Sequence, residues 1–225
     1  MKKIFSSLPV KLLIGIVIGI IFGQIFPENV MSVVVPLKNI LGQVINFVVP
    51  LIVIGFIAPS ITKLGNNASR MLGVALMVAY TSSVLAALLS MGAGYAIIPN
   101  LPVVSEIEGL KELPEDVFGL TIPQIMNVMS ALAFSILIGL AAIWTKAKTI
   151  ITILDEFQNI VLAIVSKIII PILPVFIAFT FTCLSYDGTI TKQLPVFVSA
   201  VVIVMIGHYI WLTVLYVVAG VSSGK

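Results

Sequence analysis

Residues 45–65 read I-N-F-V-V-P-L-I-V-I-G-F-I-A-P-S-I-T-K-L-G, and no charged side chain interrupts this stretch before Lys63. A helix needs about 20 mostly apolar residues to cross the ~30 Å hydrocarbon core of a bilayer. The stretch therefore predicts a transmembrane helix, which we place at Ile40–Ile61. Comparable runs on both sides of it predict an all-α integral membrane protein with six transmembrane helices, the other five at Pro9–Phe26, Met71–Ile98, Ile122–Trp144, Ile160–Leu184 and Leu194–Val221.

The composition excludes several classes of function. Only 9% of the 225 residues are charged and 60% are apolar, whereas soluble domains carry about 25% charged residues. So few charges cannot cover a water-soluble globule, which excludes a soluble enzyme and a nucleic-acid-binding domain. With Cys183 as the single cysteine and His208 as the single histidine, a disulfide framework and a cysteine- or histidine-rich metal site are excluded too. The sequence contains no nucleophile–base pair and no paired carboxylates, so we expect no enzyme.

The distribution of charge predicts the topology. With both termini in the cytoplasm, the cytoplasmic segments hold most of the basic residues, as the positive-inside rule requires, and the outer loops hold most of the acidic ones. The high pI thus reflects orientation in a plasma or inner membrane, not a nucleic-acid partner. Lys2 and Lys3 precede an apolar stretch as in a signal peptide, but no small-residue cleavage site follows, so we expect an uncleaved first span. The polar residues 99–123 divide the six spans into three and three, an inverted arrangement on which many secondary transporters are built.

Polar residues inside the spans are the candidates for function, and each has two interpretations. Thr81, Ser82 and Ser83 lie in the middle of the third span. Their hydroxyl oxygens suit a hard cation such as Na⁺, or they serve helix–helix or intrahelical hydrogen bonds. Lys167 is a functional intramembrane charge or a snorkelling lysine. His208 is a proton relay or a neutral packing residue.

Two patterns concern packing. Gly15, Gly19 and Gly23 recur every four residues, a spacing that allows close helix approach in lipid. The fifth helical pattern begins as early as Lys148, and Pro171 and Pro174 are expected to kink it within the membrane.

The region around residues 45–65 resembles the dicarboxylate/amino acid:cation symporter family, which includes glutamate and aspartate transporters. That family shows a central P-L/I in an apolar helix and then S-I-x-x-L-G at a cytoplasmic turn, matched here by Pro50-Leu51 and residues 60–65. Residues 11–23 look like its first span, and residues 154–165 followed by 171–176 look like its fifth. The order is correct over essentially the whole chain. The usual Lys-Met pair before the proline is missing, with Asn46-Phe47 nearby instead, which indicates a divergent branch.

The resemblance implies a fold and a division of labour. It implies a glutamate-transporter-like scaffold that forms a homotrimer, and a transport domain that moves through the membrane like an elevator. Family members are usually much longer, and the re-entrant hairpins and the seventh and eighth helices, which hold the substrate, have no counterpart here. We therefore expect an amino-terminal portion truncated before those hairpins. The implied parts are scaffold helices one and two (1–70), transport-domain helix three (71–98), an outer loop (99–123), scaffold helices four and five (124–184) and transport-domain helix six (190–225).

The implied function is secondary active symport in the lipid bilayer, coupling a Na⁺ (or H⁺) gradient to uptake of acidic amino acids or C4-dicarboxylates. The resemblance matches Thr81-Ser82 with a Thr-Ser pair that contributes to one Na⁺ site of the family; no other cofactor is implied. One alternative is a non-transporting trimeric scaffold or one half of a split transporter. Another is an unrelated six-span channel or carrier.

Overall fold

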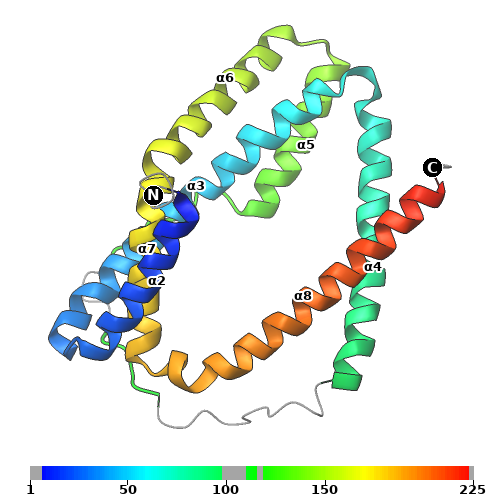
Figure 1. Cartoon of the computed structure of the whole chain (residues 1–225). Helices are drawn as coiled ribbons and strands as arrows, with labels where there is room; N and C mark the ends of the chain where they lie inside the picture. Colours follow the sequence, from blue (N-terminus) through cyan, green and yellow to red (C-terminus); the bar gives the residue numbers. More distant parts are fainter. Residues whose placement is uncertain (1–6, 98–109, 116–118, 223–225) are drawn as a thin grey trace. The chain divides into compact units, whose positions relative to one another are not determined.

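The computed structural model describes residues 7–97, 110–115 and 119–222, and within these ranges the regular structure is helical throughout. Five of its helices or continuous helical segments are long and apolar enough to cross a membrane. The apolar helix α5 has 17 residues, about 25 Å, which is short for a full crossing. The elements in chain order (Figure 1) are α2 (Leu8–Ile25), α3 (Glu28–Lys63), the 3₁₀ turn η1 (Gly65–Asn67), α4 (Ala68–Ile97), α5 (Val128–Trp144), α6 (Lys148–Ile164), the π-helical turn η3 (Val165–Ile169), α7 (Ile170–Tyr186) and α8 (Thr189–Ser222).

Two predicted boundaries were wrong. Helix α3 begins at Glu28 rather than Ile40, because residues 30–37 are mostly apolar and Met31 among them is fully buried. Helix α5 begins at Val128 rather than Ile122, because the Asn127 side chain caps it by accepting a hydrogen bond from the Met129 amide at 2.9 Å. Most of the predicted outer loop 99–123 lies outside the described residues.

The early start of the fifth helical pattern is confirmed. Helices α6, η3 and α7 run continuously over Lys148–Tyr186, and Figure 1 shows the change of direction between α6 and α7. Pro171 has no amide hydrogen, so it cannot bond the carbonyl of Lys167 four residues earlier. The π turn directly before this proline accommodates that gap, with the Ile170 amide reaching back to the Val165 carbonyl.

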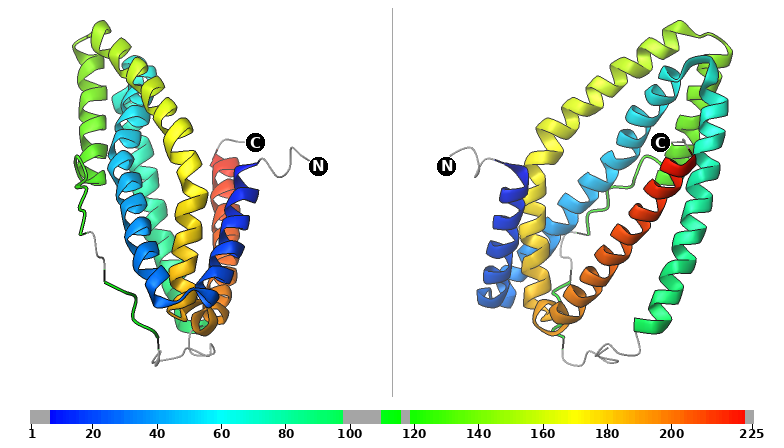
Figure 2. Two further views of the ribbon diagram at one scale, coloured as in Figure 1. Left: turned by 90° about the vertical axis from the view of Figure 1, so that its left-hand side faces the viewer. Right: turned by 45° about the vertical axis from the view of Figure 1, so that its right-hand side comes forward.

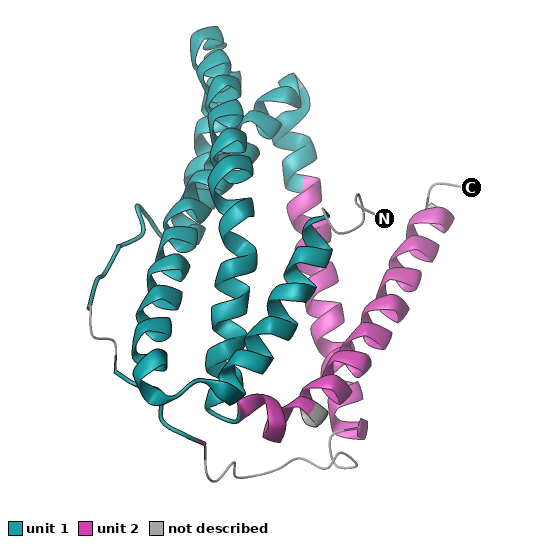
Figure 3. Cartoon of the chain, turned by 60° about the vertical axis from the view of Figure 1, so that its left-hand side comes forward, with its two compact units in different colours: residues 1–73, 111–188 teal, residues 74–110, 189–225 magenta. Residues whose placement is uncertain are grey.

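The chain divides into two compact units, coloured in Figure 3. Unit 1 consists of residues 1–73 and 111–188, which contain α2, α3, the first turn of α4, and α5 through α7. Unit 2 consists of residues 74–110 and 189–225, which contain the rest of α4 and all of α8. Each unit therefore joins segments that are far apart in the sequence.

Within unit 1, α2 packs closely against α7, as Figures 1 and 2 show. A Cβ atom built at Gly15 would lie 2.8 Å from the Pro174 carbonyl oxygen, and Gly19 and Gly23 meet the α7 backbone more closely still. The Ser185 hydroxyl adds a hydrogen bond of 2.8 Å to the Ile20 carbonyl. The predicted role of the glycine spacing, close helix approach, is confirmed.

The remaining helices of unit 1 pack on α3. Gly55 of α3 faces Val161 of α6, and Gly139 of α5 faces Ile61. At the other end of α3, Met31 and its neighbours form a buried cluster with Cys183 of α7. Small residues at the first two contacts bring the helices close together, as is common where lipid provides no hydrophobic driving force between helices.

Charges segregate to the two ends of unit 1. The α3–α4 turn carries Lys63 and Arg70, and the α5–α6 turn carries Lys146 and Lys148. Both turns lie at one end (Figure 1), joined by a hydrogen bond of 3.2 Å from the Trp144 indole to the Ser69 hydroxyl. At the same end, the Lys63 ammonium lies 3.2 Å from an Asp155 carboxylate oxygen and 3.1 Å from the Gln158 amide oxygen.

The opposite end of unit 1 carries acidic residues. Glu28 opens α3 there, and Asp187 follows the last residue of α7. The Lys111 amide bonds the Asp187 carbonyl at 3.0 Å, and the Lys111 ammonium lies 5.4 Å from the centre of the Tyr186 ring. The positive-inside rule orients a membrane protein by the lysines and arginines near the membrane, so the basic end is the one that carries this signal.

Candidate cation site

The predicted cation ligands lie in unit 2, on α4. Thr81 is exposed, and Ser82, on the adjacent face of the helix, is half-buried toward α8. The Ser82 hydroxyl accepts a hydrogen bond of 3.2 Å from the indole N–H of Trp211 on α8. Of the two interpretations of the hydroxyl cluster, helix–helix hydrogen bonding is therefore present at Ser82, and cation binding by Thr81 and Ser82 stays a prediction.

The hydroxyls of this cluster differ from others in the chain. Thr81 and Ser83 make no hydrogen bond within the described residues, and Ser82 makes only its bond with Trp211. Elsewhere in the described residues, hydroxyls donate to the carbonyl four residues earlier in their own helix, among them those of Ser60, Ser135, Thr145, Thr152, Thr180, Thr182 and Thr213. Within the described residues, the structure thus shows no intrahelical hydroxyl bond at Thr81 or Ser82, and the role of the two hydroxyls stays a prediction.

A cavity of about 420 Å³ adjoins this contact inside unit 2. Trp211 lines it, so the indole that bonds Ser82 also forms part of the cavity wall. Most of the other lining is apolar or small, with Ser90 and His208 as further polar residues. It lies between one face of α4, with Ala86, Leu89, Ser90, Ala93, Gly94 and Ile97, and one face of α8, with Ala200, Ile203, Val204, Gly207, His208 and Trp211.

His208 stands beside Tyr209 in an edge-on ring contact, with the ring centres 6.1 Å apart. It lines the cavity, and no hydrogen bond or ion pair joins its side chain to another described residue. Its role as a proton relay or as a packing residue stays open between the two interpretations.

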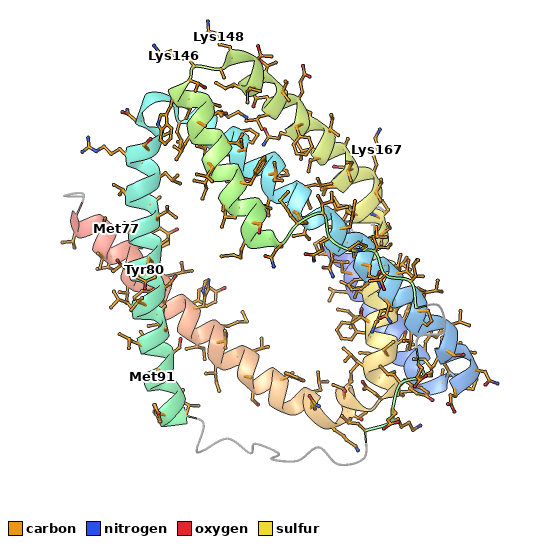
Figure 4. All side chains as sticks on the ribbon, turned by 180° about the vertical axis from the view of Figure 1, so that it is seen from behind. Met77, Tyr80, Met91, Lys146, Lys148 and Lys167 are labelled. Carbon is orange, nitrogen blue, oxygen red and sulfur yellow. The ribbon has the colours of Figure 1, made fainter. Side chains whose placement is uncertain are left out.

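The opposite face of α4 is apolar and exposed. Met77 and Tyr80, labelled in Figure 4, are 72% and 75% exposed. A soluble protein rarely leaves such a face uncovered, whereas lipid or another membrane segment covers it in a membrane protein. The exposed face thus agrees with the class of protein predicted from composition.

Lys167 belongs to unit 1 and lies on the π turn, with its side chain exposed. Figure 4 shows this side chain directed toward the end of the unit that carries Lys146 and Lys148, as snorkelling requires. The level of Lys167 along α3 is a second observation, and it is the one that favours an intramembrane charge. It follows from two contacts that flank Lys167, in which Gly55 of α3 faces Val161 and Gly42 of α3 faces Phe176.

Interpolating between these two contacts places Lys167 opposite about Pro50. That level is the middle of the uncharged stretch of α3 between Lys38 and Lys63, about 18–20 Å along the helix from either charge. A lysine side chain is shorter than this distance. Both interpretations of Lys167 therefore stay predictions, because its side chain points toward the basic end while its register lies level with the uncharged stretch of α3.

The described residues contain no cluster of three or more His, Cys, Asp or Glu side chains that could hold a metal ion. The donor set at Thr81 and Ser82 consists of neutral hydroxyl oxygens, which suit a hard monovalent cation better than a transition metal. Two such oxygens supply only part of a cation's coordination shell. The pair therefore fits a partial site to which further oxygens must be added.

A comparison of the sequence with models of known protein families identifies the family of this chain. The model of the sodium:dicarboxylate symporter family matches residues 8–225. The chain belongs to this family. The match confirms the resemblance based on Pro50-Leu51 and residues 60–65, and it supports a multi-pass membrane protein of the symporter type. No curated protein and no solved structure gave a match.

The contact of Trp211 with the hydroxyl cluster was not predicted from the sequence of this symporter-family chain. A signal for it exists, because a tryptophan within an apolar span needs an acceptor for its indole N–H. The Thr81–Ser83 cluster is the richest group of hydroxyls in the spans on either side of the polar loop. Which of these hydroxyls would meet the indole depends on the rotation and crossing of α4 and α8, which the sequence alone does not specify.

Proposed function

We propose that this chain works in a secondary active symporter that couples a Na⁺ (or H⁺) gradient to uptake of acidic amino acids or C4-dicarboxylates. In this proposal unit 2 belongs to the part that moves through the membrane, and Thr81 and Ser82 bind a coupling cation. Unit 1 belongs to a static scaffold that assembles as a homotrimer. The protein resides in a plasma or inner membrane with both termini in the cytoplasm.

The observation that carries the proposal is the division of the helices. Most of α4 and all of α8 belong to one compact unit, although about 90 residues of chain separate them, and α2, α3 and α5 through α7 form the other. An elevator mechanism needs two bodies of this kind, because one must move while the other stays fixed. The helices of unit 2 are those that the family resemblance assigns to the moving part.

The orientation rests on charge. Lys63, Arg70, Lys146 and Lys148 gather at one end of unit 1, which the positive-inside rule assigns to the cytoplasm. Asp187 lies at the other end. The inverted arrangement of three and three spans follows if α5, despite its length of 17 residues, crosses the membrane with local thinning of the bilayer.

The test is transport by the protein as its native host makes it, purified through an amino-terminal tag and reconstituted in liposomes. We expect accumulation of radiolabelled aspartate or succinate with an inward Na⁺ gradient, and loss of accumulation when the gradient is dissipated. A proton gradient of the same size distinguishes H⁺ coupling. Uptake that follows neither gradient would overturn the proposal.

Hydroxyl variants locate the cation site within the same assay. Thr81→Ala and Ser82→Ala are each expected to raise the Na⁺ concentration for half-maximal uptake. Ser83→Ala is the matched control, because it removes a neighbouring hydroxyl from a different face of the same helix turn. Equal effects of all three variants would contradict a site at Thr81 and Ser82.

A trimeric scaffold without transport is the second candidate, and the packing of unit 1 favours it. The α2–α7 contact and the contacts of α3 with α5, α6 and α7 all lie inside that unit, so it has an internal core of its own. This candidate predicts a trimer by native mass spectrometry together with no uptake driven by either gradient. A monomer would exclude it.

A further inference from the structure

We propose that Trp211 is a positioning residue for the cation site, because its indole N–H holds the Ser82 hydroxyl in the orientation that a cation can use. This inference rests on the proposed function, in which Thr81 and Ser82 bind the coupling cation. It adds a residue of α8 to a site whose ligands lie on α4.

The donor in this contact is unambiguous. An indole N–H donates and never accepts, so the Ser82 oxygen must be the acceptor in the 3.2 Å bond with Trp211. A hydroxyl oxygen has two lone pairs and one hydrogen. The bond uses one lone pair and leaves the second for a cation, and it directs the hydroxyl hydrogen away from the indole.

The alternative conformation of Ser82 is visible elsewhere in this chain. Hydroxyls such as those of Ser60, Ser135 and Thr213 donate to the carbonyl four residues earlier, a common local competitor of other hydrogen bonds in helices. For Ser82 that carbonyl belongs to Val78. Without the indole, the Ser82 hydroxyl is expected to turn toward Val78, and its lone pairs then point away from the Thr81 oxygen.

The position of Trp211 between α4 and α8 allows its indole to hold the Ser82 hydroxyl. The indole is half-buried, and one side of it lines the cavity between α4 and α8. The ring is therefore held between the two helices of unit 2, and its N–H reaches across to α4.

The expected effect is moderate. A neutral hydrogen bond typically contributes about 0.5–1.5 kcal/mol net, which corresponds to a change of about two- to tenfold in an equilibrium constant. Removing the indole N–H should therefore raise the Na⁺ concentration for half-saturation by about two- to tenfold. It should leave the maximal number of bound ions unchanged.

The test uses ²²Na⁺ binding to the protein as its native host makes it, purified into lipid nanodiscs, with choline chloride keeping the ionic strength constant. Trp211→Phe keeps an aromatic ring and removes the donor. Replacement of Trp211 by 3-benzothienylalanine keeps the shape of the indole and removes only the N–H, so it stays informative if the phenylalanine variant fails to fold. Trp144→Phe is the matched control, because Trp144 makes the same kind of bond, also at 3.2 Å, with Ser69 in unit 1.

A spectroscopic readout separates positioning from a general loss of structure. In the Trp144→Phe protein, Trp211 is the single tryptophan of residues 1–225. Its emission is expected to change on addition of Na⁺, with the half-saturation found by ²²Na⁺ binding. Addition of choline should leave the emission unchanged.

The outcomes distinguish this inference from the proposed function. Na⁺ binding that Ser82→Ala weakens, and that both Trp211 replacements weaken while Trp144→Phe does not, supports both. Na⁺ binding that is sensitive to Ser82→Ala and equal to wild type in both Trp211 replacements overturns the role of Trp211 alone. Absence of Na⁺ binding to the wild-type protein as its native host makes it overturns the cation site itself and the positioning role with it.

Discussion

The glycines of α2 allow a quantitative test of how unit 1 is held together. An alanine at position 19 would place its Cβ within 2.9 Å of the Phe181 Cβ, 3.2 Å from the Ala178 carbonyl carbon and closer still to the Ala178 oxygen. Two of these atoms belong to the backbone of α7, which cannot move aside like the end of a flexible side chain. Gly19→Ala therefore forces α2 away from α7.

The cost follows from three terms. Overpacking by a methyl group costs about 1–3 kcal/mol. Separating the helices also weakens or breaks the 2.8 Å hydrogen bond from the Ser185 hydroxyl to the Ile20 carbonyl, which contributes about 1 kcal/mol. Replacing a helical glycine by alanine returns about 1 kcal/mol. We expect a net loss of about 1–3 kcal/mol in the free energy of unfolding.

Cys183 reports this loss without any added label site. It is the single cysteine of the chain, lies on α7 and is only 3% exposed. Its reaction with a maleimide therefore requires opening of the unit, so we expect Gly19→Ala in nanodiscs to react about 5–150 times faster than wild type.

The control is another glycine of unit 1. A Cβ at Gly73 would meet nothing within 4 Å, so Gly73→Ala should react at the wild-type rate or more slowly. A wild-type rate for Gly19→Ala would refute the close approach of α2 and α7 as a source of stability.

Three further predictions concern other contacts. Asn127→Ala should lower the melting temperature by about 2–4 °C, because it removes a cap worth about 1 kcal/mol; Asn127→Asp should not, and equal melting of both variants would contradict the cap. Lys63→Gln and Asp155→Asn should show a coupling below about 1 kcal/mol that falls with added salt, because the side chains are 59% and 43% exposed; a double-mutant cycle above that value would show a stronger link. Lys167→Leu should favour membrane insertion of residues 148–186 by about 3 kcal/mol in a glycosylation-reporter assay, and unchanged insertion would show that Lys167 does not meet the hydrocarbon core.

Much of the fold could be predicted because a membrane span leaves a strong compositional signal. The predicted first, third and sixth spans agree with α2, α4 and α8 within about five residues at each end. The boundaries that failed depended on weaker signals. The start of α3 lies among apolar residues on the far side of Lys38, and the start of α5 depends on one side chain, Asn127, which looks like any polar residue before a span.

The candidate site was only partly accessible in the sequence. Thr81 and Ser82 stand out because hydroxyl clusters are rare in apolar spans. Trp211 did not, because its partner is 129 residues away and the contact depends on how two helices cross. For the same reason the depth of Lys167 could not be obtained from its own helix, since it follows from the register of α3 against α6 and α7 at Gly55 and Gly42.

Several helix contacts of this chain lie at glycines, which have no side chain. Lipid tails are as apolar as leucine, so a hydrophobic stripe does not show which face of a membrane helix meets another helix. Gly19, Gly55 and Gly139 do show it, because in each case the neighbouring helix occupies the space where a Cβ would be. Gly73 and Gly207 look the same in the sequence and meet nothing. In the sequence alone, the regular spacing indicates the contact at Gly15, Gly19 and Gly23, whereas the contacts of Gly55 and Gly139 become visible only in the structure.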